Sequence, residues 1–199
     1  MKRLTVILAI CVLSTTISAQ KENTFFGHNG LRLTGAWGGA SHSINKFDGQ
    51  RASFSGRFGG LEFGKKLLVG WGHFDLNNSS NAIVEGRAID MDYRGLILGL
   101  APNATKKLHM SYGLMLGKGK VDLANLDSND SDKIYVIQPS AGVELNVFRW
   151  FHVGLEGGYR FVRDSDIANL SNADISSPYA NLRLKFGWSW GRDKSKIEF

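Results

Sequence analysis

The chain lacks several features that would point to other protein classes. Its 199 residues include one cysteine and three prolines, and no run of 18 or more apolar residues occurs anywhere in it. The missing apolar run excludes a membrane-spanning α-helix, and the scarcity of proline excludes collagen and proline-rich linkers. A lone cysteine excludes a disulfide framework. Glycine is abundant instead, because 24 of the 199 residues are glycine, about 12% where about 7% is usual. This composition favours an all-β protein.

The N-terminal segment has the layout of a secretory signal peptide. Lys2 and Arg3 form its positive end, a nearly unbroken apolar run covers 4–17, and Ala19 is the small residue at the cleavage position. We therefore expect residues 1–19 to be removed, the only cysteine with them. The remaining chain has 22 basic and 18 acidic side chains. So mild a positive charge in an exported protein predicts no nucleic-acid binding.

Most of the remaining chain alternates apolar and other residues with a period of two. Between Phe151 and Phe161, for example, every second residue is apolar or glycine, and His152, Glu156 and Arg160 occupy the other face. Such alternation is typical of β-strands and does not fit helical spacing. The pattern predicts eight strands, at 31–41, 53–64, 67–76, 88–101, 106–121, 133–147, 151–163 and 178–190.

Two places interrupt the alternation. The segment 54–63 changes phase at Gly59 and Gly60, which predicts a bulge or a bend. Pro139 lies inside a strand although proline has no N–H to give to a neighbouring strand. We therefore expect a local bulge at Pro139 as well.

The connections alternate between short and long. Short turns are expected at 65–66, 102–105 and 148–150, whereas the long, polar connections are 42–52, 77–87, 122–132 and 164–177. In an antiparallel meander all the long connections then lie at one end, which is typical of bacterial outer-membrane barrels. The predicted fold is an all-β, eight-stranded antiparallel up-and-down transmembrane β-barrel over 31–190. A periplasmic N-terminal segment, 20–30, precedes it and a charged periplasmic tail, 191–199, follows it.

One face of the strands is apolar and aromatic over about ten residues, enough to cross a bilayer when the strands tilt. The other face mixes both charge signs with glycine and serine. A soluble lipocalin-like barrel with an apolar interior for a ligand is the alternative reading. Aromatic residues gather near strand ends, where a membrane–water interface favours them. The residues assigned to this interface are Trp37, Trp71, Tyr93, Phe148, Trp150, Phe151, Trp188 and Trp190.

Eight strands leave a bore that side chains can fill. The polar network assigned to it comprises Arg32, Arg57, Asp90, Asp92, Arg94, Glu144, Glu156, Arg160, Arg183 and Lys185. Unpaired buried charges are costly, so a salt-bridged structural plug is the favoured interpretation. A narrow ion path or a proton-linked switch remains open, and a broad diffusion pore is not expected.

One pair of residues suggests chemistry. His109 and Ser111 share a strand face two residues apart, which resembles the His-x-Ser pair of outer-membrane lipid A deacylases, where histidine would activate the serine hydroxyl. The register turns both into the bore, whereas a lipid-cleaving pair must face acyl chains. A lipid-modifying enzyme is therefore the alternative, and a protein without catalysis is the main expectation. The sequence predicts no cofactor and no metal site.

The whole chain resembles the small eight-stranded outer-membrane barrels of Gram-negative bacteria, the OmpX/OmpA-transmembrane-domain type. The signal peptide, the Val153-Gly154-Leu155-Glu156-Gly157-Gly158-Tyr159-Arg160-Phe161 strand and the aromatic-terminated last strand carry the resemblance, which covers about residues 29–190. It implies insertion by the outer-membrane insertion machinery and contact with outer-membrane lipids and lipopolysaccharide. It also implies a role in envelope structure, adhesion or surface interaction through the four long loops. Family members often end on an aromatic residue, so the insertion signal is placed at Leu184–Trp190 rather than at Phe199.

Overall fold

The computed structural model describes residues 32–47, 50–77, 83–84, 87–124, 129–164 and 172–190. The predicted signal peptide, the N-terminal segment 20–30, and the tail with Phe199 lie outside these residues. None of the helices within them is long and apolar enough to cross a membrane. The elements are β1 (Leu33–Phe47), β2 (Gln50–Phe63), β3 (Leu67–Leu76), β4 (Ile83–Val84), β5 (Arg87–Leu100), β6 (Leu108–Ala124), β7 (Asn129–Phe148), β8 (Phe151–Arg163), α2 (Asn172–Ile175) and β9 (Ser177–Ser189).

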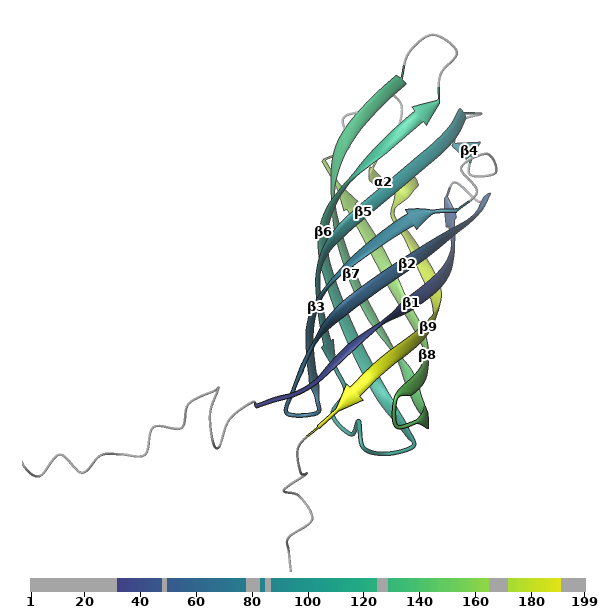
Figure 1. The fold of residues 1–199 in the computed structure, drawn as a ribbon. Coiled ribbons are helices and arrows are strands. Elements are labelled where there is room, and N and C mark those ends of the chain that lie inside the picture. Colours follow the sequence, from purple (N-terminus) through teal and green to yellow (C-terminus); the bar gives the residue numbers. More distant parts are fainter. Residues whose placement is uncertain are drawn as a thin grey trace, which may run out of the picture. The chain divides into compact units, whose positions relative to one another are not determined.

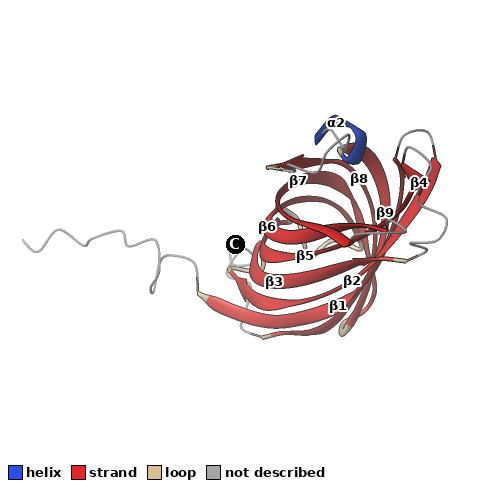
Figure 2. Ribbon diagram, turned by 90° about the horizontal axis from the view of Figure 1, so that it is seen from above, coloured by secondary structure: helices blue, strands red, loops and turns tan. Residues whose placement is uncertain are grey.

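Eight of these strands form a closed barrel in which every pairing is antiparallel (Figures 1 and 2). Each strand pairs with the next along the barrel, β3 pairs directly with β5, and β1 closes the ring on β9. The two-residue β4 pairs with β5 alone. The predicted fold class is therefore confirmed.

The turn between β2 and β3 shows how the short connections are made. Gly64 and Lys65 both have positive φ, 58° and 56°, and Lys66 N–H donates to the Phe63 carbonyl at 3.1 Å. Positive φ at both central residues defines the type I′ turn, whose twist matches that of the strands it joins. Lys65 carries a strained backbone for a non-glycine residue, and its N–H is held by the Thr34 hydroxyl at 2.8 Å.

Two of the predicted long loops are mostly strand. The ladder of β1 and β2 runs to Phe47 opposite Gln50, so the expected loop 42–52 is wrong over most of its length. The ladder of β6 and β7 likewise runs to Ala124 opposite Asn129, in place of the loop 122–132. These ends are polar in sequence and were therefore assigned to loops. A ladder outside the lipid needs no apolar outer face, which is why polar residues continue these strands.

Neither predicted bulge is present. Gly59 and Gly60 pair regularly with β1 and β3, and Pro139 stands in register opposite Leu114 of β6. On the β8 side the ladder omits Gln138 and Pro139 without any shift of register. There the Pro139 carbonyl accepts a hydrogen bond from the Tyr179 hydroxyl at 3.3 Å. The missing proline N–H therefore interrupts the ladder locally but inserts no extra residue.

The polarity of the barrel wall reverses along its length. Near the short turns the exterior is apolar, with Leu100, Leu108 and Leu155 each about half exposed. We call this apolar part of the exterior the apolar belt. Near the long connections the apolar side chains turn inward instead. They form one cluster of buried residues: Ala52, Phe54, Leu76, Ile89, Met91, Tyr93, Ile97, Met115, Val121, Ile134, Val136, Val162 and Ile175. The turn end of the barrel thus suits a lipid surrounding, and the loop end is packed like a soluble protein.

The loop end extends beyond the length that a membrane requires. About 9–11 tilted residues cross a bilayer, and β3 has 10 residues, whereas β6 has 17 and β7 has 20. The β6–β7 hairpin accordingly rises beyond the other strands in Figure 1. We call the charged outer wall at this end the collar; it comprises 87–94 of β5, 118–124 of β6 and 129–135 of β7.

Candidate functional site

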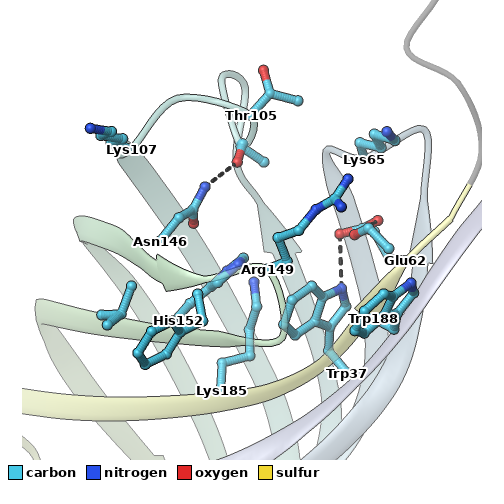
Figure 3. A pocket seen from close by; sticks show the side chains of 14 residues that line it. Trp37, Glu62, Lys65, Thr105, Lys107, Asn146, Arg149, His152, Lys185 and Trp188 are labelled. Carbon is cyan, nitrogen blue, oxygen red and sulfur yellow. Dashed lines mark hydrogen bonds between the residues drawn. The ribbon is translucent and has the colours of Figure 1, made fainter.

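The bore opens at the turn end into a cavity of about 670 Å³ (Figure 3). Its polar lining includes Glu62, Lys65, Lys107, His152 and Lys185. These side chains come from β2, β8, β9 and the turns between strands, so the cavity depends on the closed barrel.

Glu144 is the centre of the charged network above this cavity. Its Oε1 accepts hydrogen bonds from Lys185 Nζ and His152 Nδ1, both at 2.8 Å. His109 Nε2 lies 3.5 Å from the same oxygen, and its Nδ1 donates to the Lys106 carbonyl at 3.1 Å. One carboxylate thus holds β6, β8 and β9 together from the inside of the barrel.

A second carboxylate, Glu62, closes the seam between the first and last strands. Its Oε2 accepts the Trp37 indole N–H at 3.0 Å, and its Oε1 accepts the hydroxyls of Thr34 and Ser189 at 3.1 and 2.6 Å. Trp37 in turn packs on His152 with ring centroids 4.4 Å apart. Because Thr34 and Ser189 come from β1 and β9, this network ties the ring at its closing pair.

The middle of the bore is occupied by a further ion pair. Arg183 Nη1 lies 2.8 Å from Glu156 Oε1, and Asn181 Nδ2 donates to the other oxygen at 3.4 Å. The Arg183 guanidinium also lies 5.3 Å from the centre of the Phe58 ring. A strong pair with an aromatic wall leaves little room for water at this level.

Arg160 fills the bore next to the apolar cluster and is fully buried. Its guanidinium carbon lies 3.9 Å from the centre of the Phe54 ring, and its Nε donates to the Tyr93 hydroxyl at 3.1 Å. Tyr93 donates onward to Gln138 at 2.8 Å. Among the described residues no carboxylate pairs with Arg160, so aromatic faces and neutral polar groups surround its charge.

The structure divides the predicted polar network between the two faces of the wall. Five members lie in the bore: Glu144, Glu156, Arg160, Arg183 and Lys185. The expectation for β5 and β2 is wrong, because Arg57, Asp90 and Arg94 are exposed on the exterior, and Asp92 shares that face. Arg32 is exposed and lies just before β1. The physical reason is the reversed polarity of the loop end, where charges face water and not a lipid.

The predicted interface aromatics divide in the same way. Trp71, Trp150, Trp188 and Trp190 are 44–54% exposed on the exterior. At the turn end Trp150 stacks on Phe148, 5.5 Å between centroids, and Phe151 stacks on Phe186 at 4.8 Å. Trp37 and Tyr93 were assigned wrongly, since they are buried in the bore at 3% and 0% exposure. Each has a hydrogen-bonding tip that a polar bore can satisfy.

The His109 and Ser111 pair does not have the arrangement of a nucleophile and its base. Both side chains are buried in the bore, as the register predicts. His109 is directed to Glu144 and to the Lys106 carbonyl, and within the described residues Ser111 Oγ has no hydrogen-bond partner. A lipid acyl chain outside the wall has no access to either.

Comparison with known proteins supports the fold and nothing narrower. No protein-family profile and no curated protein sequence matches the chain. The structure of Neisserial surface protein A is similar with a TM-score of 0.59 at 10% identity, covering 81% of this chain and 99% of that one. The N-terminal β-barrel domain of Pseudomonas aeruginosa OprF gives 0.58 at 10% identity, covering 78% and 98%. The chain has the fold of the small outer-membrane barrels.

This outer-membrane barrel carries its lipid-facing side chains on the outside of a closed wall. A soluble barrel of the lipocalin type would bury them around a ligand, so that alternative is wrong. Transmembrane barrels with an outward apolar band are characteristic of the bacterial outer membrane, and the chain is an outer-membrane protein.

Sequence reasoning missed two of the most connected residues in the bore. Glu62 lies in the segment where the apolar pattern changes phase, because Phe54 and Phe58 face inward while Leu61 faces out. His152 was on the correct face of its strand, opposite the apolar residues, but it was not chosen as a site. Counting positions in steps of two from Glu156 would have placed His152 in the bore.

Proposed function

We propose that this outer-membrane barrel is a non-conducting protein without catalysis that acts at the cell surface. Its role lies in envelope structure, adhesion or surface interaction, through the protruding collar and the connections at that end. The observation that carries the proposal is the occupied bore. Charged pairs fill it at two levels, Arg160 fills it at a third, and the apolar cluster follows.

The composition of the bore supports a plug rather than a path. Three carboxylates, Glu62, Glu144 and Glu156, are balanced by the cations Lys185, Arg183 and Arg160, and most of these side chains are held by short hydrogen bonds. An ion would have to displace partners at each level and then cross the apolar cluster. Open aqueous channels occur in barrels of 16–18 strands, whereas the bore of an eight-stranded barrel is just wide enough for side chains to fill.

The collar supports a role outside the membrane. The β6–β7 hairpin continues as a regular ladder well past the apolar belt, and an apolar core fills the barrel beneath it. This is a rigid, folded body that a membrane anchor alone would not require. Rigid elements that present charged loops suit contacts with surfaces or other macromolecules.

Planar bilayer recording tests the closed bore. Purified, folded protein should add no stepwise conductance to a bilayer in which a general porin, added as the positive control, gives clear steps. Stable single-channel steps from the protein would contradict the proposal. Loss of those steps on boiling the sample would show that they came from the folded barrel.

A trimmed collar tests the surface role. Lys118 and Tyr135 stand directly opposite each other, so replacing residues 119–134 by Asn-Gly should give a two-residue hairpin in the same register. Cells carrying this variant should attach less to epithelial monolayers, or survive less in serum, than cells with the intact protein. Replacing the turn 102–105 by a linker of equal length is the control. Equal attachment and survival with intact, trimmed and absent protein would contradict a surface role.

A further inference from the structure

A sharp boundary crosses the outer wall on β3, β5, β6, β7 and β8, where the apolar belt ends. Five exterior side chains stand directly opposite one another across neighbouring strands in its last apolar row: Trp71, Leu96, Leu116, Ile137 and Phe161. The next exterior row, two residues further along each strand, is largely cationic: Arg57, His73, Arg94, Lys118, Tyr135 and Arg163. Because neighbours in a row are cross-strand pairs, this change in polarity occurs at one line on all of these strands.

Four exposed cations concentrate on β5, β6 and β7 at this line. Arg94 stands directly opposite Lys118, and Lys120 stands directly opposite Lys133. Like charges in such positions destabilise a sheet. Throughout the part of the chain that the structure describes none of the four forms an ion pair, and Asp92, opposite Lys120, is the one carboxylate in direct register with them. This single carboxylate offsets only part of the repulsion among the four cations.

The same four side chains line a hollow on the outer wall. It has a volume of about 600 Å³, and Asp92 and Tyr135 also line it. A second, almost entirely apolar hollow of about 390 Å³ continues from it toward the belt, lined by Trp71, Leu116 and Ile137. Arg94, Lys118 and Tyr135 belong to both hollows. Together the two hollows place cations on the side of the collar and an apolar groove on the side of the belt.

We propose that this collar site binds lipopolysaccharide through the phosphates of its lipid anchor. The anionic phosphates lie among Arg94, Lys118, Lys120 and Lys133, and one acyl chain lies in the groove beside Trp71. The site is at the end of the barrel that carries the long connections, which faces the cell exterior. The lipid that meets it there is the phosphorylated glycolipid of the outer leaflet. This inference needs only the barrel and its place in the membrane, so it stands whether or not the collar has an adhesive role.

Charge complementarity favours this occupant over a neutral lipid. Each Lys or Arg at an anionic lipid surface strengthens binding by roughly fivefold, and four of them converge here, none in an ion pair with another described residue. An amphiphile with phosphates at the headgroup level and chains below matches the order of the two hollows. A soluble phosphate has no use for the apolar groove, so lipid attachment is part of the site.

Titration with purified diphosphoryl lipid A tests the site. The folded protein in non-ionic detergent is mixed with the lipid, and the bound fraction is measured by native mass spectrometry. The variant K118Q/K120Q/K133Q should bind about 100-fold more weakly. The matched control K66Q/K106Q/K107Q removes the same charge from exposed lysines in the short turns and should bind like the unmodified protein. Added salt should weaken binding to the unmodified protein much more than binding to the triple variant.

Other probes decide the chemistry. Dephosphorylated lipid A and phosphatidylglycerol should bind the unmodified protein at least tenfold more weakly than the diphosphoryl form, and millimolar inorganic phosphate should not displace it. The proposal is overturned by equal affinity of the triple variant and the control, or by equal affinity for phosphatidylglycerol. Folding of each variant is checked by its gel mobility before and after boiling. If the triple variant does not fold, the single variant K118Q should show about a fivefold loss.

Discussion

Replacing Glu144 by glutamine should destabilise the barrel from the inside. Glu144 Oε1 receives Lys185 Nζ and His152 Nδ1 at 2.8 Å each, and both Glu144 and Lys185 are almost fully buried. Glutamine keeps the volume of the side chain and one acceptor oxygen, but it removes the negative charge. The Lys185 ammonium would then remain in the bore without an anion.

The magnitude follows from the surroundings of Lys185. Breaking a buried ion pair on one side costs about 3–5 kcal/mol of unfolding free energy. The turn-end cavity of about 670 Å³ borders Lys185, so water can solvate part of the charge. Glutamine also continues to accept a hydrogen bond. We therefore expect a loss of about 2–3 kcal/mol, the cost of a charged group left without its charged hydrogen bond.

Urea unfolding of the protein in lipid vesicles, followed by tryptophan fluorescence, measures this loss. The control variant Asp90→Asn changes an exposed exterior carboxylate and should stay within about 0.5 kcal/mol of the unmodified protein. The double variant Glu144→Gln/Lys185→Met should be more stable than Glu144→Gln alone, because it removes the orphaned cation. A Glu144→Gln variant as stable as the Asp90→Asn control would refute the reasoning.

Three further predictions use the same unfolding assay. Leu155→Lys, in the middle of the lipid-facing belt, should cost about 2–4 kcal/mol, whereas Asp90→Lys on the collar should cost about 0–1; equal costs would mean that the belt is placed wrongly. Gly72→Val should cost about 1–3 kcal/mol, because a Cβ there would lie 2.5 Å from Ile97 Cδ1 and 2.9 Å from Phe74 Cε2. Gly59→Ala, whose nearest atom is 3.9 Å away, is its control, and similar stability of the two variants would count against tight packing. Arg160→Met should change stability by less than about 1.5 kcal/mol, since Arg160 has no carboxylate partner in the described bore and methionine avoids burying a charge; a larger loss would mean that its aromatic contacts dominate.

The sequence is a good guide to the fold where one side of a strand meets lipid. On β8 the apolar residues from Phe151 to Phe161 alternate without a break, since every exterior position crosses the belt. The short turns also follow from sequence, because each joins strands at the turn end, where the belt begins at once. These two signals together are sufficient for the strand number and the meander.

The same alternation does not reveal which face is wet. On β5 the prediction puts Asp90, Asp92 and Arg94 in the bore. The structure instead places Ile89, Met91 and Tyr93 there, in the apolar cluster, and Leu96 and Leu100 meet the lipid from the opposite face. A period of two fixes which residues share a face and leaves the identity of that face open. Tyr93 and Leu96 are an odd number of residues apart and therefore lie on opposite faces of β5, although the strand contains no bulge between them. That difference was the available signal that the environment, and not the register, changes along β5.

The reversal of polarity also explains why the bore and the collar have different chemistry. Below the boundary the apolar side chains face the lipid, so the side chains in the bore are polar. Buried charges are stable there only in pairs, such as Glu144 with Lys185. Above the boundary the charged side chains face water, so the interior is an ordinary apolar core that requires no ion pairs. Among the described residues Lys118 and Lys120 form no ion pair, and Asp92 is the carboxylate that stands opposite Lys120. Along this line the lipid-facing side chains adjoin the cations of the collar, and a phosphorylated lipid could contact both, which is the basis of the proposed site.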